Sequence, residues 1–236
     1  KRTRKLRSML DAWALKKPRA GASFSAEPRE VAKLLGHLVF ASQVVPQART
    51  YTQSMLSSFA GLQVDWVRGM VQMPGGRYSL LHLQRSFWED LEWWSAHLET
   101  RNSTLIGKRP APEAVVAGTD ASNFGCGELV WLNGQRAEVM LRFTQAEVRR
   151  PINWRELLGI VRVVEVWGPE LKGKRLLIET DNLAAKYSAA KGSSKAEDMQ
   201  ELVRRLVEEC ERWEVDLKLT HTPGVMLHRP DATSRG

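Results

Sequence analysis

The chain contains 236 residues, of which 43% are hydrophobic and 26% charged, and this composition excludes a disordered, collagenous or fibrous protein. No uninterrupted apolar run approaches the roughly 18 residues that a membrane span requires, so we expect no membrane association. Two cysteines are too few for a disulfide framework or a zinc site, which favours a reduced intracellular location, cytoplasmic, nuclear or both. The chain starts at Lys1 without a signal-peptide pattern, so we expect it to be a piece of a longer protein.

The net charge of +8 is unevenly distributed. Residues 1–110 carry a net charge of +9, whereas the remainder carries −1. Within residues 1–19, eight basic residues accompany a single acid, Asp11. A basic flank suits a nucleic-acid partner, because neutralisation of phosphates dominates such affinity. A solvated basic tail is the alternative interpretation, and the sequence leaves both open.

The first half is predicted to be mainly helical. Apolar residues at helical spacing, with Pro28 suited to a first turn and Pro46 as a stop, predict a helix over 26–46. The next elements expected are a helix, a short strand, a turn and a helix, at 47–60, 63–71, 74–76 and 80–99. Trp88 and Trp93 lie off the apolar line of the last helix. We expect them to pack against a neighbouring domain rather than stack on nucleic-acid bases.

After a polar linker at 101–112, strands and helices alternate. Strands are predicted at 114–119, 125–132, 136–143, 175–180 and 215–219. Helices are predicted at 153–167, 182–190 and 195–213, with a further short helix starting at Pro230. Asn133-Gly134 predicts a hairpin, and Gly168-Pro169 is expected to end the first of these helices. This order predicts an α/β domain over 111–236, preceded by a helical segment over 1–110.

Four acidic residues fall where such a sheet would place chemistry. Asp120 and Asp181 each directly follow a predicted strand, and Glu156 lies one turn into the helix after the hairpin. Asp231 lies near the end of the chain, beside Pro230. If the two strands are neighbours, their terminal carboxylates approach each other. Each acid alone has an ordinary alternative as a turn, cap or ion-pair residue, but together they indicate one site.

Converging carboxylates repel one another and raise one another's pKa. A divalent cation removes this penalty, and ligation by oxygen alone suits Mg²⁺ or Mn²⁺. Two ions about 3.5–4 Å apart can activate a water molecule and stabilise a leaving alkoxide. The expected cofactor is therefore a pair of Mg²⁺ ions, with Mn²⁺ as the alternative.

The segments that carry these acids resemble the RNase H domain of retrotransposon reverse transcriptases, and most closely that of gypsy-like and DIRS-type elements. In chain order they are Thr119-Asp120-Ala121-Ser122, Asn153-Trp154-Arg155-Glu156-Leu157-Leu158-Gly159-Ile160, Thr180-Asp181-Asn182, His221-Thr222-Pro223-Gly224 and Pro230-Asp231-Ala232-Thr233-Ser234-Arg235. The resemblance covers residues 113–235. It implies an RNase H-like fold, in which helices flank a mixed five-stranded sheet.

By that resemblance, Asp120, Glu156, Asp181 and Asp231 match the four metal-binding catalytic acids of the family. Asp120 would bridge both ions, Glu156 and Asp181 would bind one, and Asp231 would bind the other. The implied activity is that of a metal-dependent endoribonuclease. Water would attack the RNA strand of an RNA–DNA hybrid and leave 5′-phosphate and 3′-hydroxyl ends.

Other residues near these motifs are candidates for binding the substrate. The side chains suited to contact the 2′-hydroxyls that distinguish RNA are those of Ser122, Asn123 and Asn182. All three are equally good turn residues. His228 could assist product release or be an ordinary loop residue, and His221 is expected to be a structural partner. In the last motif, Leu227 and Pro230 replace the family's usual Asn and Ala, which leaves the carboxylates in place.

The first half resembles, less specifically, the helical thumb and connecting segment that follows the palm of such polymerases. The resemblance rests on the stretch from Arg29 to Leu38, with Leu34-Leu35-Gly36 at its centre, and on Val45-Pro46. It implies a grip on duplex nucleic acid, which the charge of +9 suits. The Tyr/Phe-x-Asp-Asp signature of the palm is absent from the sequence. The expected partner is therefore a fingers and palm domain outside this chain, and polymerisation by this chain alone is not expected.

Two alternatives differ in function. An integrase or transposase nuclease of the same superfamily would use two aspartates followed by a glutamate near the end, whereas here the glutamate comes second. A catalytically silent domain could serve as a nucleic-acid-binding or scaffold module. The presence of all four acids argues against it, although presence does not establish geometry.

Overall fold

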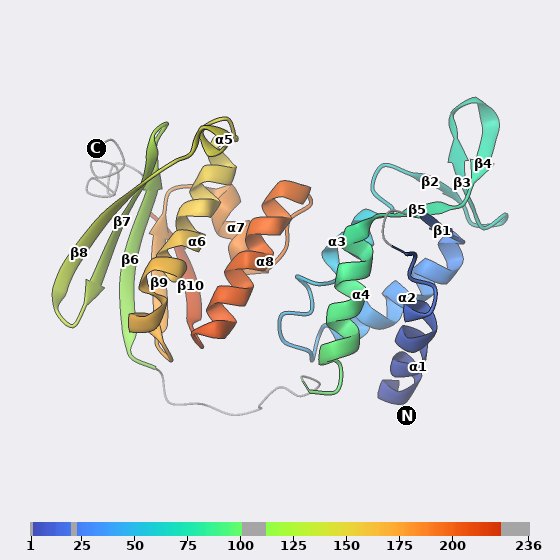
Figure 1. Ribbon diagram of the computed structural model, residues 1–236, viewed down its shortest axis with the longest axis horizontal. Coiled ribbons are helices and arrows are strands. Elements are labelled where there is room, and N and C mark those ends of the chain that lie inside the picture. Colours follow the sequence, from blue (N-terminus) through green and yellow to red (C-terminus); the bar gives the residue numbers. More distant parts are fainter. Residues whose placement is uncertain (1, 20–22, 101–111, 223–236) are drawn as a thin grey trace. The chain divides into compact units, whose positions relative to one another are not determined.

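The computed structural model describes residues 2–19, 23–100 and 112–222 (Figure 1). The chain divides into two compact units, residues 1–107 and 108–236. Within the described residues, no helix has both the length and the apolar character that a membrane crossing demands.

The first unit is mainly helical and contains two small sheets. Its helices are α1 (Arg2–Ala14), α2 (Pro28–Ala41), α3 (Gln53–Ser57) and α4 (Arg85–His97), with a 3-10 turn η1 at Pro74–Gly76. Its strands are β1 (Phe24–Ala26), β2 (Gln63–Asp65), β3 (Met70–Met73), β4 (Arg77–Ser79) and β5 (Leu81–Leu83). β1 pairs antiparallel with β5, and β2, β3 and β4 form an antiparallel sheet.

The basic first residues are not a solvated tail, and that alternative is wrong. They form α1, which places Leu6, Leu10 and Trp13 in the core of the unit. The rings of Trp13 and Phe87 lie 5.6 Å apart. The apolar residues follow the three- and four-residue spacing of a helix face, which the dense charge around them obscures in the sequence.

Several boundaries in this unit differ from the prediction. α2 ends at Ala41, and the chain then makes turns through Pro46 and Gln47, whose φ of 59° cannot belong to a helix. The predicted helix at 47–60 is reduced to α3, and the predicted strand at 63–71 is a β2–β3 hairpin. Each local sequence pattern is also compatible with a longer helix or strand. Pairing within the unit selects the shorter elements.

Trp88 and Trp93 of α4 both pack within their own unit. Trp88 is 4% exposed, and its ring centroid lies 5.3 Å from that of Phe24 in an edge-on arrangement. Trp93 stacks on Tyr51 with ring centroids 4.2 Å apart. The prediction that Trp88 packs against a neighbouring domain is therefore wrong.

The second unit has the predicted α/β architecture. Its strands are β6 (Ala114–Ala121), β7 (Gly125–Leu132), β8 (Gln135–Arg142), β9 (Arg175–Thr180) and β10 (Asp216–His221). Its helices are α5 (Gln145–Val148), α6 (Ile152–Leu171), α7 (Leu183–Lys191) and α8 (Glu197–Arg212). The sheet order is β10-β9-β6-β7-β8, with β6, β7 and β8 antiparallel and with β9 parallel to both β6 and β10. The expected mixed five-stranded sheet is confirmed.

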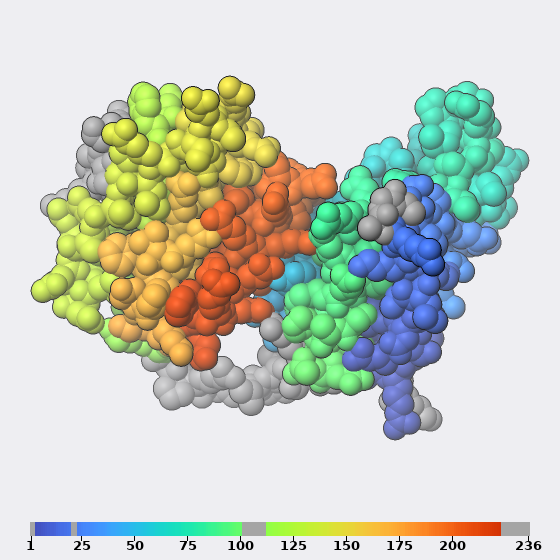
Figure 2. Space-filling model, in the orientation of Figure 1, coloured from blue at the N-terminus to red at the C-terminus, as the bar shows by residue number. Residues whose placement is uncertain are grey.

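Two long helices cover one face of this sheet. Figure 1 shows α6 and α8 side by side, and the space-filling view from the same side shows the outer surface of α8 in orange-red (Figure 2). α8 turns Leu202, Val203 and Leu206 into the core and leaves most of its charged residues toward solvent. The core of the unit therefore lies between the sheet and these two helices.

α6 continues past Gly168-Pro169 to Leu171, so the prediction that these residues end it is wrong. Pro169 lies in the last turn of the helix, where only one backbone hydrogen bond is lost. Gly168 lies against the indole of Trp213. Packing at this contact therefore outweighs the poor helix propensity of the pair.

Substituting Gly168 with alanine is expected to destabilise the second unit by about 1–3 kcal/mol, because a small-to-large change in a packed site forces its neighbours apart. A Cβ at this position would lie 2.1 Å from Nε1 of Trp213. Gly36→Ala in α2 is the control, since its Cβ would meet nothing within 4 Å. That change should stabilise its own unit by about 0.5–1 kcal/mol through helix propensity. Denaturant unfolding of each variant measures both changes in the free energy of unfolding. Equal effects of the two substitutions would contradict the close contact between Gly168 and Trp213.

Candidate metal centre

The sheet brings two aspartates to the same edge. β6 and β9 run parallel, with Gly118 opposite Glu179 in the register. Asp120 lies two residues beyond Gly118, and Asp181 lies two residues beyond Glu179, directly after the end of β9. The carboxyl ends of neighbouring parallel strands meet at one edge of a sheet, so the two side chains start from adjacent positions.

The third acid comes from α6, which packs closely on β6. Gly159 makes this approach possible, because a Cβ there would lie 2.6 Å from Oγ1 of Thr119. Glu156 precedes Gly159 by three residues and therefore lies on the same side of the helix, one turn closer to the strand end. The backbone N–H of Ala121 donates a hydrogen bond of 3.0 Å to Oε1 of Glu156. The end of β6 and the start of α6 are thus joined at the site.

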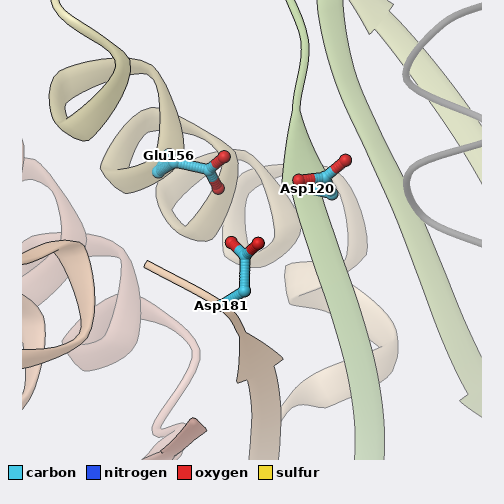
Figure 3. A group of neighbouring side chains, drawn as sticks. All are labelled: Asp120, Glu156 and Asp181. Atoms are coloured by element: carbon cyan, nitrogen blue, oxygen red, sulfur yellow. The ribbon is translucent and has the colours of Figure 1, made fainter. Parts of the chain in front are cut away.

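Asp120, Glu156 and Asp181 converge (Figure 3). One carboxylate oxygen from each residue lies within 4.8 Å of the others. The exposure of the three side chains is graded: Glu156 is 3% exposed, Asp120 is half-buried and Asp181 is open to solvent. The cluster therefore has a buried base and an accessible rim.

Burial dominates the electrostatics of Glu156. Burial, the largest cause, and the nearby charges of Asp120 and Asp181 together raise the pKa of this carboxyl to about 8, against the opposing effect of the Ala121 N–H and Arg155. Oε2 of Glu156 is buried and has no hydrogen-bond partner among the described residues. A carboxylate in this setting is unfavourable unless a proton or a cation compensates its charge.

This donor set fits a divalent cation. All ligand atoms offered are carboxylate oxygens, which hard cations such as Mg²⁺, Mn²⁺ and Ca²⁺ prefer. The unpartnered Oε2 of Glu156 provides a buried ligand atom, and the exposure of Asp181 leaves an open side for water or a phosphate oxygen. The cluster has the composition expected of a catalytic metal site rather than a closed structural one.

The turn after Asp120 holds two of the predicted substrate-binding residues. The hydroxyl of Ser122 donates to the carbonyl of Gly125 at 3.1 Å and accepts from the N–H of Phe124 at 3.0 Å. Arg155 is buried and donates to the carbonyl of Ser122 at 2.6 Å and to Oδ1 of Asn123 at 3.2 Å. Arg155 is not among the predicted site residues, because an arginine in an amphipathic helix ordinarily faces solvent.

The third predicted substrate-binding residue, Asn182, lies at the junction between β9 and α7. Asn182 is the N-cap of α7, and its Oδ1 accepts from the N–H of Ala185 at 2.9 Å. Its Nδ2 donates to Oδ1 of Asn153 at 2.9 Å. His221, at the end of β10, places Nε2 3.1 Å from the carbonyl oxygen of Asp181, in keeping with the structural role expected of it. Asn153 was also missed, because it is an exposed polar residue with no motif of its own.

Two predicted site residues, Asp231 and His228, lie outside the described residues, as does the short helix predicted from Pro230.

The family comparison agrees with this geometry. Residues 113–208 match the model of the RNase H-like domain found in reverse transcriptase. The matched segment contains Asp120, Glu156 and Asp181. This part of the chain is therefore an RNase H-like domain of the reverse-transcriptase kind. No curated protein matches the sequence.

Solved structures show weak overall similarity. RNase H1 from the halophilic archaeon Halobacterium salinarum is 17% identical with a TM-score of 0.41, and the match covers 51% of this chain and 93% of the archaeal one. The foamy viral protease-reverse transcriptase dRH in complex with double-stranded DNA is 12% identical with a TM-score of 0.37, covering 92% of this chain and 35% of the viral one. The same viral protein in complex with an RNA/DNA hybrid is 13% identical with a TM-score of 0.33, covering 92% and 26%. The chain thus spans about a third or less of these viral chains.

Proposed function

We propose that this chain is the ribonuclease H portion of a retroelement reverse transcriptase, of gypsy-like or DIRS type, which hydrolyses the RNA strand of RNA–DNA hybrids. The observation that carries the proposal is the convergence of Asp120, Glu156 and Asp181 within 4.8 Å. These acids lie inside the segment that matches the RNase H-like domain of reverse transcriptase. Their arrangement suits the binding of a divalent cation at the accessible edge of the sheet.

In this proposal, Glu156 and Asp181 would hold one cation, Asp231 would hold a second, and Asp120 would contribute to both. Two Mg²⁺ ions, or Mn²⁺ in their place, would supply water activation and stabilisation of the leaving oxygen. Glu156 anchors the buried side through the Ala121 N–H, which fixes one of its oxygens and leaves the other for a ligand. Asp181, open to solvent, lies where a phosphate of the substrate can approach.

The proposal extends to the rest of the chain. Residues 1–110 would correspond to a thumb and connection segment whose net charge of +9 suits duplex nucleic acid. The polymerase fingers and palm would be provided by a part of the protein outside this chain. The proposed intracellular location, cytoplasmic, nuclear or both, rests on the low cysteine content of the chain.

The test is cleavage of an end-labelled RNA–DNA hybrid in the presence of Mg²⁺. Double-stranded RNA, double-stranded DNA and a chelator serve as controls, and Asp181→Asn purified in parallel excludes a contaminating nuclease. The expected result is cutting of the hybrid's RNA strand alone, which requires the metal and is lost in the variant. If the protein binds the hybrid without cutting it, the domain is a silent nucleic-acid-binding module. Cutting of DNA would favour a transposase-like nuclease.

A further inference from the structure

A pair of asparagines connects the two elements that carry Glu156 and Asp181. Nδ2 of Asn182 donates a hydrogen bond of 2.9 Å to Oδ1 of Asn153. Asn153 lies in the first turn of α6, and Asn182 lies between β9 and α7. The hydrogen bond therefore joins a helix to a strand end across 29 residues of sequence.

The orientation of the Asn182 amide is fixed by its role as an N-cap. Its Oδ1 accepts from the N–H of Ala185 at 2.9 Å, and its own backbone N–H donates to Oγ1 of Thr180 at 3.3 Å. With the oxygen directed at the start of α7, the amide nitrogen is left to face Asn153. The bridge is thus a consequence of the cap geometry as well as a contact between two surface side chains.

Both asparagines are close in sequence to an acid of the cluster. Asn182 directly follows Asp181, and Asn153 precedes Glu156 by three residues, which is one helical turn. On its other side, Asp181 is held through its carbonyl oxygen by Nε2 of His221 at 3.1 Å. The backbone that carries the exposed Asp181 is therefore held from two directions, one of which is the helix that carries Glu156.

We propose that Asn153 is a positioning residue that acts through Asn182 to hold Asp181 at the spacing from Glu156 that a shared divalent cation requires. The inference rests on the metal centre of the proposed function. Without a cation, the three carboxylates repel one another, and Asp181, at the open rim, is the one free to move away. The bridge opposes this movement. Preorganisation of ligands by a surrounding layer of hydrogen bonds is a general source of metal affinity.

Three variants test this inference through the Mg²⁺ concentration that gives half of the maximal thermal stabilisation, a readout that does not depend on activity. Asn153→Ala removes the acceptor. Asn182→Ser removes the donor but keeps a side-chain oxygen suited to cap α7. Each single variant is expected to raise the half-saturating Mg²⁺ concentration roughly two- to tenfold, the equivalent of one hydrogen bond. The double variant is expected to show no further increase, because both changes break the same contact.

Several outcomes overturn the inference. They are unchanged half-saturation in the single variants, effects that multiply in the double variant, or lower transition temperatures in chelator with no change in Mg²⁺ response. Hybrid cleavage by the wild-type protein distinguishes a failure of this inference from a failure of the proposed function. Mg²⁺ stabilisation that depends on Asn153, in a protein that cuts no hybrid, supports the positioning role and contradicts the nuclease. Hybrid cleavage by the wild type, together with an unchanged Mg²⁺ response in the variants, supports the nuclease and contradicts the positioning role.

Discussion

Asp120→Asn is expected to abolish hybrid cleavage without weakening the fold. In the proposed site both cations would share Asp120, so losing its charge removes a ligand of each. Metal-assisted stabilisation of the transition state is worth several kcal/mol, so the rate should fall on the order of a thousandfold or more. The charge of Asp120 also raises the pKa of Glu156. Removing it relieves repulsion, and the variant should unfold at the same or a higher temperature in the absence of metal.

The matched control for this experiment is Glu128→Gln. Glu128 is fully buried on β7, and burial raises its pKa to about 8, as it does for Glu156. It is not a member of the acidic cluster. Its amide variant should keep wild-type cleavage, since it also removes a buried titratable group but none of the proposed ligands. Single-turnover cleavage and thermal unfolding are measured on both variants. Activity retained by Asp120→Asn, or lost by Glu128→Gln, would contradict the assignment of Asp120 as a metal ligand.

The sequence predicts the second unit well because its local signals agree with its tertiary structure. The predicted strands at 125–132 and 175–180 match β7 and β9 at both ends, and Asn133-Gly134 forms the hairpin turn with positive φ at both residues. Buried strands bounded by turn residues and an amphipathic helix leave few competing folds. The extension of α6 through Pro169 was missed because it depends on a contact with Trp213, which is distant in sequence.

The first unit is less predictable because its small sheets depend on non-local pairing. β1 and β5 contain three residues each and pair across more than fifty residues of sequence. Leu83 continues the helical spacing of Phe87 and Leu91, which extends the predicted helix to it, whereas pairing with β1 selects a strand there. α1 was missed for a different reason. Its apolar face is narrow, and the basic residues around it resemble a solvated segment.

The candidate site is also predictable only in part, since some of its features follow from local sequence signals and others from non-local contacts. The positions of Asp120, Glu156 and Asp181 at strand ends and on the first turns of α6 allowed their convergence to be expected before the structure was known. The surrounding hydrogen bonds were not expected. Arg155 and Asn153 have ordinary residue types for an exposed helix face, and their roles follow from the turn and the cap that happen to lie opposite them. The residue types of metal ligands can be recognised in a sequence. The residues that hydrogen-bond around them are determined by the tertiary structure.

Glu156→Gln is expected to invert the order of stability between variant and wild type when a divalent cation is added. In the absence of metal, the folded protein keeps a proton on Glu156 up to about pH 8, whereas the unfolded chain loses it near the ordinary value of 4.5. The free energy of unfolding of the wild type therefore falls as the pH rises between these values and levels off above them. Glutamine cannot ionise, so the variant lacks this fall.

The difference should be largest at about pH 8.5 without metal. There the variant is expected to be more stable by a few kcal/mol, at about 1.4 kcal/mol for each pKa unit. Near pH 4 the two proteins should unfold alike, because both carry a neutral side chain at this position. Glu128→Gln should show the same gain, since the pKa of Glu128 is also raised to about 8.

Mg²⁺ separates the two variants. A cation that binds only the folded state stabilises it by mass action, and its binding requires Glu156 to be ionised. Wild type and Glu128→Gln should both gain stability with Mg²⁺, increasingly so as the pH rises, whereas Glu156→Gln should gain little. At pH 8.5, saturating Mg²⁺ should therefore raise the wild type above Glu156→Gln. Thermal unfolding over a grid of pH and Mg²⁺ concentration checks this crossing, and an equal Mg²⁺ response in all three proteins would show that the buried carboxylate is not a ligand.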